Sequence, residues 1–293
     1  MKKIIIFLTI IIFVCSCSKP ESEQVLKIST TSWIGYSPLY YAKEKGWLDD
    51  ANIKLVNAVS LSENMYLYQA GHSDAFCGTQ YEYSVLKKQQ PNLIPLMLFD
   101  RSNGGDLIMS NRSIDELKSG NKPINAYLEM DSINFILLND FIKTHHIDEQ
   151  RIHYINRDQV EISVLTNASP NEQVIIVTYI PFDISLRKNG FKEISSTKYG
   201  LDLLVIDGLY APKTTFVKHE KQFKKLKEFS DKAITALQNH PHEFYKIVKP
   251  YIGSLNYQEF NDNLGDIVWI NKKLTKLLKA RIRQASLPIK DIL

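Results

Sequence analysis

Val25-Leu-Lys-Ile-Ser-Thr-Thr-Ser-Trp-Ile-Gly-Tyr-Ser-Pro38 is the stretch that decides the fold. Its first six residues alternate between apolar and polar side chains, which predicts a β-strand. Ser37 and Pro38 then supply an N-cap and a first-turn proline, so a helix should begin there. This helix should end near Lys45, because the glycine Gly46 that follows it readily terminates a helix. A strand that leads directly into a helix indicates an α/β unit.

The same order of strand and helix recurs along the rest of the chain. We expect further strands at 53–57, 75–77, 93–99, 106–110, 123–127, 153–156, 174–178 and 203–206. We expect further helices at 62–69, 81–89, 132–144, 216–237, 241–248 and 272–284, the last of them basic and exposed. The alternation predicts an α/β fold with a mainly parallel sheet. Since no Pro/Gly-rich linker divides the chain, we expect two lobes joined by strand crossovers.

The N-terminus has the form of an export signal. Two lysines precede the apolar run from Ile4 to Val14, which is about half the ~20 residues that a membrane-spanning helix needs. The run ends in Val14-Cys15-Ser16-Cys17, which resembles a bacterial lipobox. That resemblance implies cleavage after Ser16, so that 1–16 is the signal peptide, and a lipid on Cys17. Residues 17–26 would then tether the folded body to the membrane, since most of this stretch is polar.

The composition excludes several classes of protein. Without Lys2 and Lys3 the mature chain would carry 34 basic and 32 acidic residues, a net charge of +2, which gives no support to nucleic-acid binding. After lipidation of Cys17, the mature chain would keep only Cys77, so it could form no disulfide within the chain. We expect Cys77 to be a small buried residue at the end of a strand rather than a catalytic thiol.

Polar and aromatic residues gather where predicted strands give way to helices or turns. In open α/β sheets, ligands bind at the carboxyl ends of the strands, so these junctions are the candidate binding site. Aromatic walls would come from Trp33, Tyr36 and Tyr179, and orienting hydrogen bonds from Gln80, Ser102, Asn103 and Ser132. The carboxylates that would select the charge of the ligand are Asp100, Asp106, Glu129 and Asp131.

Five motifs in this order resemble a known family. They are Trp33-x-Gly35-Tyr36-x-Pro38, Ala70-Gly71-x-x-Asp74, Asp100-x-Ser102-x-Gly104-Gly105-Asp106, Val177-Thr178-Tyr179-x-Pro181 and His240-Pro241-His-Glu243. They are similar to those of the substrate-binding lipoproteins of ABC importers for nitrate, sulfonates, taurine and thiamine-type pyrimidines. The resemblance implies a type II periplasmic-binding-protein fold with two α/β lobes, two hinge strands and the ligand in the cleft between them. We expect residues 27–110 and 207–293 in lobe 1 and 111–206 in lobe 2.

The resemblance implies a monomeric protein, anchored by its lipid in the cell envelope, that hands a small molecule to an ABC permease. It implies no cofactor, metal or catalytic residue, and the chain has none of the G-x-S-x-G, H-E-x-x-H or G-x-x-x-x-G-K motifs of common enzymes. The junctions hold four candidate carboxylates and only one basic residue, Arg101. We therefore expect a neutral or cationic nitrogen-bearing ligand, because uncompensated carboxylates repel anions.

Three alternatives stay open from the sequence alone. The closed protein could dock on the ectodomain of a membrane kinase or cyclase instead of a permease. The ligand could be a sulfonate- or nitrate-type anion, and Arg101 and Arg157 would then be the residues to bind it. An enzyme related to the fungal pyrimidine synthases would share the fold, but those enzymes rely on a cysteine cluster that this chain lacks.

Overall fold

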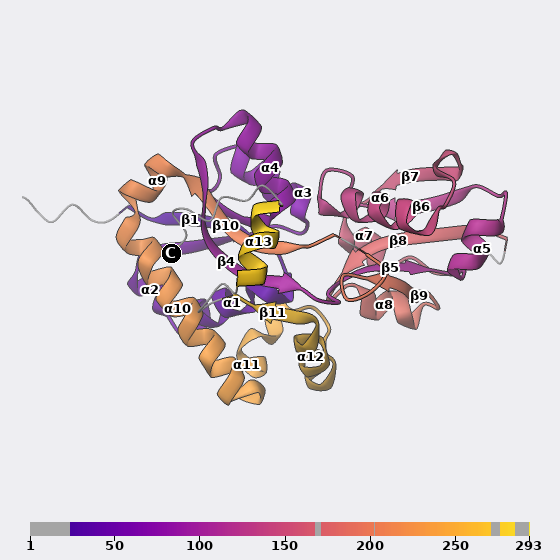
Figure 1. Ribbon diagram of the computed structural model, residues 1–293. Helices are drawn as coiled ribbons and strands as arrows, with labels where there is room; N and C mark the ends of the chain where they lie inside the picture. The colour runs from indigo at the N-terminus through magenta and orange to yellow at the C-terminus, as the bar shows by residue number, and fades with distance from the viewer. Residues whose placement is uncertain (1–23, 168–170, 202, 271–275, 285–292) are drawn as a thin grey trace, which may run out of the picture.

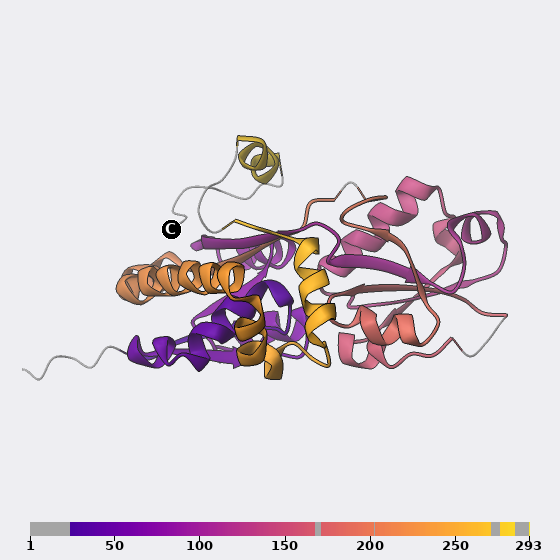
Figure 2. The ribbon, with the colours of Figure 1, turned by 90° about the horizontal axis from the view of Figure 1, so that it is seen from below.

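The computed structural model describes residues 24–167, 171–201, 203–270, 276–284 and 293. They form two α/β lobes, each built on its own sheet, and the lobes lie side by side in both views (Figures 1 and 2). The two-lobe α/β fold expected from the sequence is confirmed.

Lobe 1 contains a six-stranded sheet with the order β11-β4-β10-β3-β1-β2. Its strands are β1 (Leu26–Thr30), β2 (Ile53–Asn57), β3 (Ala75–Thr79), β4 (Leu93–Ser102), β10 (Ile206–Pro212) and β11 (Ile267–Trp269). Strand β1 is parallel to β2 and β3, whereas β10 runs antiparallel to both β3 and β4. Strands β1, β2, β3 and β4 therefore run in one direction, and the sheet is mixed because β10, which returns from lobe 2, is inserted against them between β3 and β4.

Helices cover both faces of the lobe 1 sheet. They are α1 (Ser37–Glu44), α2 (Trp47–Asp50), α3 (Leu61–Gln69), α4 (Gln80–Gln89), α9 (Lys213–Lys218), α10 (Glu220–Asn239), α11 (Pro241–Val248), α12 (Tyr257–Asn263) and α13 (Lys276–Gln284). Helix α10 packs on α1, and it buries Phe223, Leu226, Ala233 and Leu237, whose spacing of three, seven and four residues keeps them on one face of the helix. In Figure 2, α10 and α13 lie on opposite sides of the strands of lobe 1.

Lobe 2 contains a five-stranded sheet with the order β7-β6-β8-β5-β9. Its strands are β5 (Asp106–Ser110), β6 (Ile124–Leu128), β7 (Ile152–Asn156), β8 (Gln173–Tyr179) and β9 (Lys192–Ser196). Its helices are α5 (Ile114–Ser119), α6 (Ile133–His145), α7 (Gln159–Ser163) and α8 (Asp183–Lys188). Helix α6 buries Leu137, Leu138 and Phe141 in the core of the lobe.

The chain crosses between the lobes twice, and the two crossings touch. It leaves lobe 1 between β4 and β5 and returns between β9 and β10. The Ser102 N–H donates to the Val205 carbonyl (3.1 Å), and the Thr197 N–H donates to the Asp106 carbonyl (3.0 Å). Hydrogen bonds between the crossings make them a paired hinge, on which two compact lobes can rotate.

Three expected elements differ from the structure. The strand expected at 203–206 is β10, which begins at Ile206 and continues to Pro212; Gly208 and Pro212 hide its pattern in the sequence. The helix expected at 216–237 is divided at His219 into α9 and α10. The last helix is not exposed all round, because Ile282 is buried against lobe 1; residues 272–275 of that expected helix lie outside the described part of the chain.

Cys77 is fully buried in β3, which confirms the interpretation as a small core residue. The expected signal peptide at 1–16, the lipid on Cys17 and most of the tether lie outside the described residues. In the part of the chain that the structure describes, we find no helix that is both long and apolar enough to cross a membrane.

Candidate functional site

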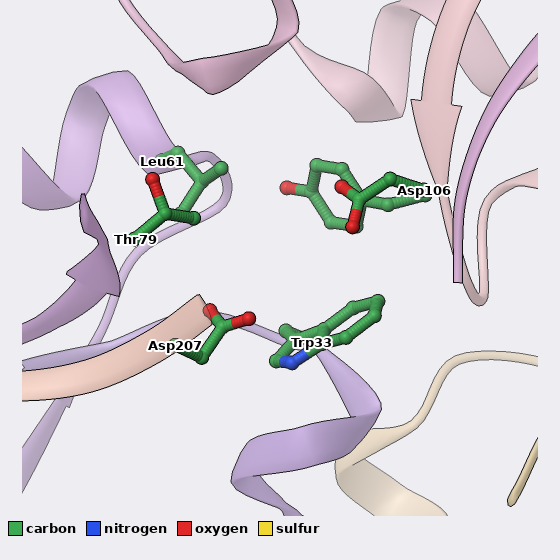
Figure 3. A pocket seen from close by; sticks show the side chains of 6 residues that line it. Trp33, Leu61, Thr79, Asp106 and Asp207 are labelled. Carbon is green, nitrogen blue, oxygen red and sulfur yellow. The ribbon is translucent and has the colours of Figure 1, made fainter. Parts of the chain in front are cut away.

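A small cavity lies between the lobes beside the hinge. It has about 230 Å³ of empty space, counted together with its open mouth. The side chains of both lobes converge on it, from the ends of strands and from the loops that follow them (Figure 3). Lobe 1 contributes Trp33, Leu61, Thr79 and Asp207. Lobe 2 contributes Tyr179 and Asp106, which the sequence assigned to lobe 1 but which begins β5 of the lobe 2 sheet.

Trp33 of lobe 1 forms one wall of the cavity and contacts lobe 2 there. It follows β1, and its ring meets the ring of Tyr179 edge to face at 6.1 Å between centroids and 78° between planes. The Trp33 Nε1–H donates to the carboxylate of Asp100, at 3.3 and 3.4 Å from its two oxygens. A Cβ on Gly35 would lie 2.1 Å from Asp100 Oδ2, and one on Gly105 would lie 2.4 Å from Trp33 Cη2. Both positions therefore need glycine for the indole to reach its place.

Two aspartates face each other across the cavity (Figure 3). Asp106 is the first residue of β5, and Asp207 is the second residue of β10, so each stands where the chain has just crossed the hinge. Asp207 accepts a hydrogen bond from the Tyr36 hydroxyl (2.6 Å). The Oδ2 atom of Asp106 is buried and finds no hydrogen-bond partner among the described residues, which is unusual for a buried carboxyl oxygen.

Burial shifts the protonation of both aspartates. It raises the pKa of Asp106 to about 7, and it raises the pKa of Asp207 well above its ordinary value, with a further contribution from the charge of Asp100. In both cases desolvation disfavours the charged form, and none of the described residues that line the cavity is basic and could compensate. The cavity is thus a place where added positive charge would be stabilised.

Two glutamates hold the lobes together at helix N-termini. Glu129, at the end of β6 in lobe 2, accepts hydrogen bonds from the N–H groups of Leu61 (3.1 Å) and Ser62 (3.3 Å) in the first turn of α3 in lobe 1. Glu82, in α4 of lobe 1, accepts one from the Ile133 N–H (2.9 Å) at the start of α6 in lobe 2. We call these contacts the reciprocal caps. Each places a carboxylate at the positive end of a helix dipole of the other lobe.

Burial also raises the pKa of both capping glutamates, that of Glu129 to about 8. A third contact between the lobes joins the hydroxyl of Tyr66 to the carboxylate of Asp131 (2.5 Å) at the surface. These contacts can form only when the lobes approach each other, so the structure shows the closed arrangement.

The structure brings three of the predicted site residues to the cavity: Trp33, Asp106 and Tyr179. Three others fix residues of the lining by hydrogen bonds. Asp100 accepts one from the Trp33 indole, and Tyr36 donates one to Asp207. The Ser102 hydroxyl accepts one from the Asp106 N–H (3.0 Å).

The remaining predicted residues point elsewhere. Gln80 accepts a hydrogen bond from the Ile206 N–H (2.9 Å) and so fastens the hinge strand β10. Asn103 accepts from Arg101 (2.9 Å), and Ser132 is the N-cap of α6, whose hydroxyl accepts from the Asn134 N–H (3.2 Å). Glu129 and Asp131 make the contacts between lobes described above rather than lining the cavity.

Sequence reasoning missed Leu61, Thr79 and Asp207 in the lining, and Glu82 as a cap. Thr79 and Glu82 lie in a strand-to-helix junction that the sequence did mark, so position could have indicated them. Asp207 was not recognised as a site residue because β10 begins later in the sequence than the strand expected there. Nothing in the sequence pairs Glu82 with α6, since this contact spans 51 residues.

Within the described ranges, no group of three or more His, Cys, Asp or Glu side chains is placed to hold a metal ion. Arg101 and Arg157 do not line the cavity; Arg157 is half-exposed and lies 4.0 Å from Glu161. The site is therefore a partly enclosed, acidic and aromatic pocket whose shape depends on closure of the lobes.

No family model and no curated protein sequence matches this chain. Solved structures do resemble it. A zinc-bound ligand-binding component of an ABC-type import system from Staphylococcus aureus matches with a TM-score of 0.69 and 14% identity, over 89% of this chain and 90% of that one. The periplasmic aliphatic sulphonate-binding protein SsuA of Escherichia coli matches with a TM-score of 0.68 and 11% identity, over 90% and 86%. The periplasmic nitrate-binding protein NrtA of Synechocystis matches with a TM-score of 0.64 and 12% identity, over 88% and 75%.

At such low identity the likeness establishes the fold, which is that of periplasmic binding proteins. The expectation of this fold from the sequence motifs is confirmed. The neighbours named here are binding proteins rather than enzymes, and their ligands differ from one to the next.

Proposed function

We propose that the protein is an extracytoplasmic solute-binding protein, which captures a small molecule between its lobes and delivers it to an ABC importer. The observation that carries this proposal is the closed cavity, which is lined from both lobes and sealed by the reciprocal caps. A pocket shared by two lobes on a paired hinge is formed by closure and opened by rotation. No bond needs to be made or broken in such a cycle.

Closure would couple binding to recognition by the permease. In the open protein, Glu82 and Glu129 would be hydrated and the first turns of α3 and α6 would be free. A ligand that bridges the two walls adds its contacts only to the closed arrangement, and it therefore shifts the population toward that arrangement. The protein can act as a monomer, because one chain supplies all six lining residues and both caps.

The importer is favoured over a sensor by the structural neighbours, three of which are named as import or periplasmic binding components. The ligand is proposed to be a small, nitrogen-containing neutral or cationic compound. The described residues of the lining include two carboxylates and no basic group, whereas a nitrate or sulfonate would need positive partners.

The lipid anchor is part of the proposal and rests on Val14-Cys15-Ser16-Cys17. Cleavage before Cys17 and acylation of its thiol would hold the protein at the membrane, facing the periplasm or the outer surface of the cytoplasmic membrane. We expect Cys17→Ser to release the protein into the soluble exported fraction or to leave the signal uncut. A Cys17→Ser protein with an unchanged mature N-terminus that still sediments with membranes would contradict the anchor.

The proposed function is tested by identifying what the purified protein carries. Small molecules released by denaturing the natively purified protein are identified by mass spectrometry and then added back to ligand-free protein. Small-angle scattering should show compaction on rebinding, and the melting temperature should rise with ligand concentration. Glu82→Ala together with Glu129→Ala should weaken both effects, whereas Glu228→Ala, on the exposed face of α10, should not. Tight binding with no change in shape would count against the proposal.

A further inference from the structure

The Oδ2 atom of Asp106 is the strongest sign of what the cavity is built to hold. Asp106 is only 4% exposed, lines the cavity and leaves this oxygen without a partner. Such an oxygen is costly to bury unless something absent from the protein itself donates to it. Asp207, 3% exposed, faces the same space from the other lobe.

We propose that the ligand is a compact organic cation whose ammonium group binds between Asp106 and Asp207. This inference rests on the proposed function and names the ligand class of the same site. The ammonium N–H groups would donate to the free Asp106 oxygen and to Asp207, which among the described residues receives one hydrogen bond, from Tyr36. Such charge-assisted hydrogen bonds are about twice as strong as neutral ones.

The other walls suit the remainder of such a cation. Trp33 and Tyr179 present aromatic rings, which attract a cation within ~6 Å of the ring centroid. Leu61 offers an apolar surface for a short carbon chain, and Thr79 a hydroxyl that can donate or accept. The two aspartates would therefore bind the charged group of the ligand, and the other walls would accept its small apolar or hydroxylated remainder.

The size of the cavity limits the body of the cation. In the closed arrangement the cavity itself has a volume of about 10 Å³, room for about one water molecule. An ammonium group could therefore enter only with a small separation of the lobes, and a nucleotide or a peptide would hold them far apart. An anion of the same size would meet two aspartates and no basic side chain in the lining.

The protonation of Asp106 gives the binding a pH dependence. Burial raises the pKa of Asp106 to about 7, so the empty site holds a proton there below neutrality. A bound cation favours the carboxylate form, and binding would release that proton. The ionisable groups whose charges act with that of Asp106 are Glu82, Asp100, Tyr179 and Asp207. All of them are acids, so none offers a positive charge in place of the ligand.

The test is a panel of small probes of different charge. Methylammonium, ethylammonium and choline represent the cations, ethanol the neutral compounds, and methanesulfonate and nitrate the anions. We expect at least one cation to bind the dialysed protein in calorimetry and to raise its melting temperature, while ethanol and the anions do neither. Its affinity should rise about 25-fold from pH 5.5 to 7.5, because ionisation of one group with a pKa of about 7 changes binding by up to a factor of ten per pH unit below that pKa.

Matched variants test whether Asp106 and Asp207 are the carboxylates that bind the cation. Asp106→Asn and Asp207→Asn should each weaken cation binding at least tenfold, whereas Asp50→Asn makes the same chemical change on the exposed surface of α2 and should leave it unaltered. Circular dichroism and melting of each variant without ligand show whether it is folded. Binding of an anion, binding of ethanol alone, or no binding of any cation at 10 mM would overturn the proposal. Compaction with the co-purified molecule would in that case still support a solute-binding function, so the two proposals fail separately.

Discussion

Raising the pH from 5.5 to 8 should destabilise the closed arrangement of the lobes that the structure shows, in which Asp106 and Glu129 are buried. Burial raises the pKa of Asp106 from an ordinary 3.8 to about 7 and that of Glu129 from 4.5 to about 8. Between the ordinary and the raised value, the folded state binds a proton that the unfolded chain has lost. The free energy of unfolding therefore falls as pH rises through this interval, and the stabilisation is complete only below the ordinary values.

The magnitude follows from the width of the interval. From pH 5.5 to its folded pKa, Asp106 spans about 1.5 units, which corresponds to about 2 kcal/mol at ~1.4 kcal/mol per unit. Glu129 spans about 2.5 units up to pH 8, or about 3 kcal/mol. Together these are comparable with the ~5–15 kcal/mol by which domains are usually stable. Burial raises the pKa of Glu82, Asp100 and Asp207 too, so their contributions have the same sign.

Urea denaturation at a series of pH values measures directly how the free energy of unfolding changes with pH. Asp106→Asn removes one titrating group, and its unfolding free energy should vary less with pH below 7 than that of the wild type. Asp50→Asn is the control, because its side chain is exposed on α2, and it should follow the wild-type curve. An unfolding free energy that stays constant or increases from pH 5.5 to 8 would refute the reasoning, because these carboxyls would then be ionised in the folded state.

Three substitutions test the packing and the caps. Phe141→Ala should destabilise the protein by ~3–5 kcal/mol in urea denaturation, because the ring is fully buried in lobe 2. Gly35→Ala should displace the Trp33 indole, since its Cβ would overlap the carboxylate of Asp100, and an unchanged tryptophan emission spectrum would argue against this. Glu129→Gln keeps one acceptor at the first turn of α3 and removes the titratable proton, so calorimetry near neutral pH should show a loss of affinity of no more than about tenfold, equal to ~1.4 kcal/mol. A loss larger than that of Asp106→Asn would place Glu129 against the ligand itself.

Local signals predicted much of lobe 1 correctly. The alternation before Thr30 and the Ser37-Pro38 pair gave β1 and α1 to within one residue, because strand periodicity and helix capping depend on near neighbours. The expectation that ligands bind where strands end also selected Trp33, Asp106 and Tyr179, which all line the cavity. The carboxyl ends of strands meet at one edge of a sheet, so such residues are brought together by the fold class alone.

The expectation that ligands bind where strands end could not separate residues that line the cavity from those that support it. Asp100 and Asp106 lie in one motif, yet Asp100 is turned onto the Trp33 indole and Asp106 faces the empty space. The difference depends on a hinge crossing only a few residues long and on the two glycines that admit the indole. Side-chain direction at a turn of this kind is set by packing between lobes, which leaves no periodic pattern in the sequence.

The sequence by itself determined the α/β class, the order of most elements, the acidic and aromatic character of the strand ends and the family resemblance, because these depend on short-range periodicity and residue type. Only the tertiary structure decided that β10 enters between β3 and β4, that Asp207 meets Asp106 across the cavity, and that Glu129 caps α3 instead of lining the pocket. The Glu129 contact joins residues 68 positions apart in two lobes. It exists because the lobes close on a paired hinge, and closure depends on the free energy of the whole molecule rather than on any one stretch of it.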